Sequence, residues 1–65
     1  MGFVVAQSVR VAHNCIVTGE YLKKGETGTI TAISESPESP VIFVKFERWV
    51  LPMRQWEIQA VGEKQ

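Results

Sequence analysis

Residue types on which enzymes and metal sites depend are scarce in this chain of 65 residues. Aspartate is absent, and His13 and Cys15 are the only histidine and the only cysteine. A metal site needs three or four ligands, and a catalytic nucleophile needs a base held by a third group. The sequence therefore specifies no catalytic residue, metal or cofactor. A single cysteine also cannot form an internal disulfide, so an intracellular location is the simpler interpretation.

The chain also lacks a long apolar run and a net charge. No apolar stretch approaches the ~18–20 residues needed to span a bilayer, and residues 1–6 lack the positive flank of a signal peptide. Gly2 matches the first position of an N-myristoylation motif, but Ala6 occupies the position at which that motif needs serine or threonine. Seven basic residues balance seven acidic ones, so no strong field attracts a polyanion. We expect a cytoplasmic protein without membrane contact and with weak or no binding to nucleic acid at physiological salt.

The composition that remains is that of an ordinary globular domain. Hydrophobic residues make up 45% and charged residues 22% of the chain, as in soluble domains, and this length allows one domain at most. Residues 34–40 depart from this pattern, because two prolines in a polar, acidic run favour a flexible connection. We predict a single domain over residues 1–65, with its core in residues 7–61, a flexible loop at 34–40 and a tail at 62–65.

Short stretches of alternating apolar and polar residues, separated by turn residues, indicate an all-β fold. In residues 3–12 one parity is apolar, which predicts a half-buried strand with Phe3, Val5, Val9 and Val11 on its inner face. Residues 14–22 are expected to form a loop. Residues 23–28 predict a turn with glycine at its fourth position, as type I turns prefer, and the β-branched residues 29–33 predict the next strand.

Residues 41–46 are expected to form the strongest strand. Ile42, Val44 and Phe46 share one face, and the opposite face is also largely apolar, so the strand is either central or partly covered. Residues 49–51 predict a short strand, Pro52–Gln55 a single 3₁₀ turn, and residues 56–61 a last strand. Five short strands bury a face best when the sheet curls onto itself, which favours a small, partly open barrel.

Three segments resemble SH3-like barrels of the bacterial and plastid type: residues 8–11 (Ser-Val-Arg-Val), residues 24–30 (Lys-Gly-Glu-Thr-Gly-Thr-Ile) and residues 56–58 (Trp-Glu-Ile). Such barrels include KOW-type domains and the variable chain of ferredoxin–thioredoxin reductase. The resemblance implies a five-stranded SH3-like small barrel over roughly residues 7–61, with a 3₁₀ turn before the last strand. The chain departs from the pattern at residues 6–8, where a Gly-Asp pair is usual, and its loop at 34–40 is acidic. Because SH3-like barrels have many unrelated roles, the resemblance concerns the fold more than the function.

Two sets of side chains are candidates for binding. The basic residues would form a phosphate-binding patch only if they cluster, and glutamates between residues 26 and 38 dilute their charge; they are Arg10, Lys23, Lys24, Lys45 and Arg54. The second set is aromatic, because a barrel of this size cannot bury every large ring. Phe46 is expected inside, whereas Phe43 and Trp49 are expected outside, and hairpin geometry predicts that these two lie close together. The resemblance places Tyr21 beside the usual ligand groove.

We therefore predict a binding surface of exposed aromatic side chains flanked by cations, a common composition of interaction hot spots. It consists of Tyr21, Lys24, Phe43, Arg48 and Trp49. The leading hypothesis is a non-catalytic protein-interaction module or small accessory subunit that docks on a protein partner or self-associates. The alternatives are a KOW-like barrel associated with nucleic acid or the ribosome, and a small oligomeric enzyme with its site at a subunit interface.

Overall fold

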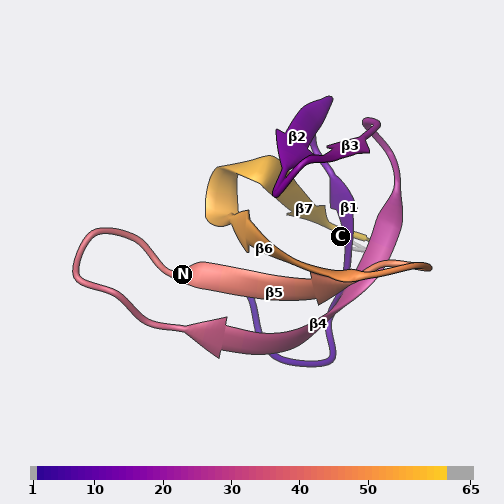
Figure 1. Ribbon diagram of the computed structural model, residues 1–65. Helices are drawn as coiled ribbons and strands as arrows, with labels where there is room; N and C mark the ends of the chain where they lie inside the picture. The colour runs from indigo at the N-terminus through magenta and orange to yellow at the C-terminus, as the bar shows by residue number, and fades with distance from the viewer. Residues whose placement is uncertain (1, 62–65) are drawn as a thin grey trace.

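Seven short strands and one 3₁₀ turn make up the part of the chain that the computed structural model describes, residues 2–61 (Figure 1). In chain order they are β1 (Ser8–Val11), β2 (Cys15–Val17), β3 (Glu20–Leu22), β4 (Thr27–Ser34), β5 (Val41–Lys45), β6 (Val50–Arg54), η1 (Gln55–Glu57) and β7 (Ile58–Ala60). The all-β prediction is confirmed, but the described residues contain seven strands and not five. The predicted tail at 62–65 lies outside the described residues.

The strands form two antiparallel sheets. The larger sheet has the order β6-β5-β4-β1-β7, and β2 pairs only with β3. The two edge strands β6 and β7 are not paired with each other, so the sheet does not close into a barrel; η1 connects them. The edge strand β6 contains Pro52, which has no N–H to offer a further strand, and the N–H of Arg54 donates to the Glu57 carboxylate at 2.9 Å.

One face of the larger sheet carries the core. The predicted inner faces are confirmed where Val9 and Val11 on β1, and Ile42, Val44 and Phe46 on or beside β5, are all buried. The whole buried cluster consists of Val9, Val11, Val17, Leu22, Ile30, Ile42, Val44, Phe46, Leu51, Met53 and Ile58.

The first predicted strand begins too early. Val5 is 55% exposed, because the chain turns at residues 4–7, where the N–H of Gln7 donates to the carbonyl oxygen of Val4. Ala6 has a φ of +79° in this turn, a conformation that costs a residue with a Cβ free energy. Only residues 8–11 form the strand.

The predicted loop at 14–22 contains β2 and β3 instead. Val17 and Glu20 pair across a two-residue turn in which Thr18 and Gly19 both have positive φ, at 47° and 86°. Two positive φ values define the type I′ turn, whose twist matches the twist of the strands that it joins. The inner residues Val17 and Leu22 reach the core cluster, and this burial supports strands of only three residues.

The turn before β4 also differs from the prediction. It spans residues 23–26, closed by the N–H of Glu26 on the carbonyl oxygen of Lys23. Gly25 occupies its third position with a φ of +96°, the pattern of a type II turn. Gly28 lies within β4.

The 3₁₀ turn comes three residues later than predicted, at Gln55–Glu57. Pro52 is tolerated within β6 because this strand lies at the sheet edge. The alternation therefore continues past Leu51, and Met53 is fully buried. The last strand is correspondingly shorter than predicted, and Trp56 in η1 is 58% exposed.

Candidate functional site

The outer face of β4, β5 and β6 is apolar around Phe43. The strand register places Phe43 between Ala32 of β4 and Pro52 of β6. Val41 precedes Phe43 on the same face, and both side chains are half-buried. Val50, two residues before Pro52, is 49% exposed. Neighbouring strands thus bring together an apolar surface, which we call the Phe43 face: Ala32, Val41, Phe43, Val50 and Pro52.

Two cations and no carboxylate accompany this surface on its three strands. Lys45 pairs with Val50, and Arg54 pairs with Val41, so both lie on the same side of the sheet as Phe43. Both side chains are exposed. The nearest glutamates along the chain lie beyond the ends of these strands; they are Glu26, Glu35, Glu47 and Glu57. The Phe43 face is therefore apolar with a positive border.

Arg48 and Trp49 lie together at the β5–β6 connection. The guanidinium carbon of Arg48 is 5.8 Å from the centroid of the Trp49 ring, within the range of a cation–π contact. Trp49 is half-buried and packs against the core cluster. Its carbonyl oxygen accepts the N–H of Phe46, so Trp49 stands opposite Phe46, whereas the partner of Phe43 is Pro52. The expected cross-strand pairing of Phe43 with Trp49 is therefore wrong.

Tyr21 lies in a different part of the molecule. It is 54% exposed on β3 and pairs with Ile16 of β2, which is 70% exposed. Figure 1 draws this hairpin above the larger sheet, away from the β5–β6 connection. Ile16 was not among the predicted site residues. The alternation of residues 15–17 and 20–22 around a central Thr-Gly turn was the signal that could have revealed it.

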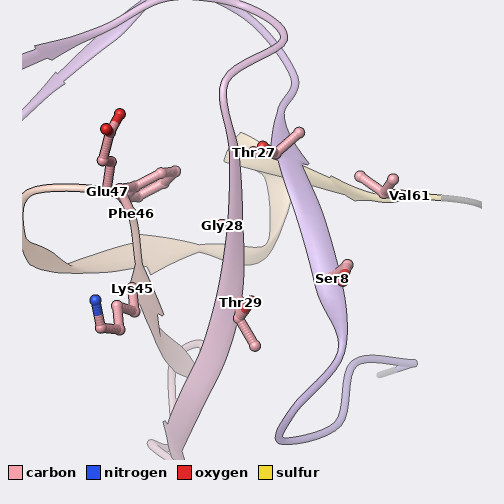
Figure 2. A pocket seen from close by; sticks show the side chains of 8 residues that line it. All are labelled: Ser8, Thr27, Gly28, Thr29, Lys45, Phe46, Glu47 and Val61. Carbon is pink, nitrogen blue, oxygen red and sulfur yellow. The ribbon is translucent and has the colours of Figure 1, made fainter.

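One groove, of ≈ 550 Å³, lies beside the start of β4 (Figure 2). Gly28 of β4 lies between Phe46 and β1 in this view and contributes only backbone atoms to the lining. The hydroxyl-bearing residues Ser8 and Thr29 face each other across β1 and β4. Its ionisable lining residues are Lys45 and Glu47, and the complete lining is Ser8, Thr27, Gly28, Thr29, Lys45, Phe46, Glu47 and Val61.

A second groove, of ≈ 360 Å³, is formed by residues of β1, β7 and the turn at residues 23–26. Its lining residues are Arg10, Val11, Lys24, Gly25 and Gln59. Of the five basic residues considered for a phosphate patch, the structure thus brings Arg10 and Lys24 into one groove. Lys45 lines the other groove, and Arg54 donates to the Ser39 hydroxyl at 3.0 Å.

His13 and Cys15 form no recognisable reactive site. His13 is exposed in the connection between β1 and β2, and Cys15 is half-buried at the start of β2. Burial raises the pKa of the Cys15 thiol, and the negative charge of Glu57 raises it further, so the thiol is less readily ionised than a free one. Within residues 2–61, no group of three or more histidine, cysteine, aspartate or glutamate side chains is arranged to hold a metal ion.

The described part of the chain contains no helix with the length and apolar character that crossing a membrane requires. Comparisons of the chain with family models, with curated protein sequences and with solved structures found no match. The function is therefore inferred from the residues and their geometry.

Proposed function

We propose that the chain is an SH3-like small barrel that acts as a non-catalytic protein-interaction module, docking on a protein partner or on a second copy of itself. Three features support the SH3-like fold: the strand order β6-β5-β4-β1-β7, the long connection between β1 and β4, and the 3₁₀ turn before the last strand. In this proposal η1, and not strand pairing, joins the two edges, so the barrel stays partly open.

The observation that carries the functional proposal is the Phe43 face. β5 buries Ile42 and Val44 on its inner side and still presents Val41 and Phe43 on its outer side. A strand that is apolar on both faces is typical of a strand covered on both faces. Contiguous apolar surface bordered by polar residues is typical of an interaction site. We therefore place Phe43 at the centre of the binding surface.

The other proposed binding residues lie outside the Phe43 face, in three different places. Arg48 and Trp49 form one unit at the end of the same sheet, where Trp49 also stabilises the core. Tyr21 adds an exposed aromatic ring on the hairpin, and Lys24 supplies a cation at the second groove. A partner that contacts all of them must extend beyond the Phe43 face.

The proposal is tested with Phe43→Ala and a matched control, Val4→Ala. Val4 is 61% exposed near the start of the chain, so both variants remove apolar surface from outside the core. Sedimentation measures self-association, and immobilised protein measures retention of partners from an extract of the source cells. We expect Phe43→Ala to weaken association at least about tenfold, as truncation of a hot spot does, whereas Val4→Ala leaves it unchanged. Urea unfolding verifies that both variants remain folded.

Three results would contradict the proposal. One is equal association of Phe43→Ala and the parent protein, and another is a monomer that retains no protein at all. The third is a sub-micromolar dissociation constant for nucleic acid at about 150 mM salt, which would favour the KOW-like alternative.

A further inference from the structure

The second groove combines two cations with an amide on neighbouring strands. Arg10 of β1 pairs with Thr27 of β4 and with Gln59 of β7. Lys24 reaches the groove from the turn at residues 23–26. Arg10 and Lys24 are both exposed at the surface. No carboxylate is among the residues described as lining this groove, although the whole chain has no net charge.

Hydrogen bonds hold both sides of this groove in place. The Nε–H of Arg10 donates to the side-chain oxygen of Gln59 at 3.4 Å, a bond that uses one of the five N–H donors of the guanidinium group. The backbone N–H of Lys24 donates to the Asn14 side chain at 2.8 Å, and the N–H of Gly25 donates to the carbonyl oxygen of Val11 at 2.9 Å. The turn that carries Lys24 is therefore fixed against β1.

The carboxylates closest along the chain already have partners. Glu26 accepts the backbone N–H of Lys23 at 3.0 Å, and Glu57 accepts that of Arg54 at 2.9 Å. Each bond links residues three positions apart in a turn, so these carboxylates already stabilise the local backbone. An oxyanion in the groove would be the partner that complements Arg10 and Lys24, because guanidinium groups bind such planar or tetrahedral anions through paired hydrogen bonds.

We propose that this groove binds a carboxylate of an acidic segment of a protein partner, with Arg10 as the fork-shaped donor, Lys24 as the second cation and the Gln59 amide as a further donor. The protein origin of the carboxylate rests on the proposed function. A carboxylate is favoured over nucleic acid because two cations are enough to complement the charge of one carboxylate side chain. Nucleic-acid binding, by contrast, takes much of its affinity from contacts between many cations and the phosphate backbone.

The proposal is tested by titrating isotopically labelled full-length protein with a capped peptide containing three consecutive glutamates. A glutamine peptide of the same length is the neutral control. We expect saturable shifts of the Arg10 Nε–H, the Gly25 N–H and the Gln59 side-chain amide with the glutamate peptide alone. Lys24→Ala should weaken binding about tenfold, the loss typical of one charge-assisted hydrogen bond. Lys23→Ala removes the same charge from a neighbour outside the groove and should have little effect.

Arg10 is tested with two variants. Arg10→Lys keeps the positive charge but removes the paired N–H donors of the guanidinium group, whereas Arg10→Ala removes both. Both Arg10→Lys and Arg10→Ala should weaken binding of the glutamate peptide. Equal losses for Lys23→Ala and Lys24→Ala would overturn the proposal, since they would indicate diffuse charge attraction. Tighter binding of inorganic phosphate or of a single-stranded oligonucleotide would overturn the choice of a carboxylate. If association through Phe43 persists while the glutamate peptide does not bind, the groove proposal is wrong, whereas the proposed function as an interaction module still holds.

Discussion

Replacing Gly28 by alanine tests how closely the strands of the larger sheet are packed. A Cβ at this position would lie 2.7 Å from the carbonyl oxygen of Lys45, 2.7 Å from Cγ1 of Val44 and 3.0 Å from Cδ1 of Phe46. The strand partner of Gly28 is the fully buried Val9, so the new methyl group would point into the core. The backbone oxygen of Lys45 yields only if β4 and β5 move apart.

The expected cost follows from the packing of small cores. Overpacking by a methyl group costs about 1–3 kcal/mol, and we expect about 2 kcal/mol for Gly28→Ala and more for Gly28→Val. A domain of this length is stabilised by only about 3–10 kcal/mol in total. The melting temperature should therefore fall by roughly 8–16 °C.

Urea unfolding of three glycine variants separates packing from backbone conformation. Gly25 has a φ of +96° and no atom within 4 Å of the place that a methyl group would take, whereas Gly2 has open space and no positive φ. Gly25→Ala should cost about 1 kcal/mol through its backbone alone, and Gly2→Ala should be nearly neutral. The packing argument is refuted if Gly28→Ala is less destabilising than Gly25→Ala.

The remaining predictions concern two strained turns and the thiol. Ala6→Gly should stabilise the domain by about 0.5–1 kcal/mol, because glycine adopts the positive φ of this position without strain; Ala32→Gly, in a strand, should destabilise it by a similar amount in the same thermal melts. Thr18→Asn should raise the free energy of unfolding by a few tenths of a kcal/mol, since asparagine favours the first position of a type I′ turn, and an unchanged melting curve would contradict this. Iodoacetamide should modify Cys15 more slowly in folded protein than in urea below the raised thiol pKa, and equal rates would show that its surroundings do not suppress ionisation.

The inner faces of the strands could be predicted because alternation is a local property of the chain. Val9 and Val11 on β1, and Ile42 and Val44 on β5, are each two residues apart, so each pair lies on one face of its strand and both pairs reach the core. Val5 has the same parity but lies before the turn at residues 4–7. Val5 is exposed because Ala6 adopts a positive φ in this turn. Alanine rarely adopts this conformation, so the sequence does not predict the turn.

The two small strands and the late 3₁₀ turn could not be predicted for a different reason. Segments of three residues are too short to establish a period, and the type I′ turn between β2 and β3 has threonine where asparagine is usual. Pro52 favours a helical turn in the sequence because proline interrupts central strands. It is tolerated in β6 because this strand lies at an edge, and edge position is a property of the whole sheet.

The candidate sites depend on register, which relates residues that are distant in sequence. Arg10 and Gln59 are 49 positions apart and become neighbours only because β7 pairs with β1. The net charge of zero averages over the whole surface, so it cannot reveal a groove in which Lys24 joins Arg10 without a carboxylate. Charge composition therefore argues against a polyanion spread over the surface and has no bearing on a single bound carboxylate, because one carboxylate requires only local complementarity.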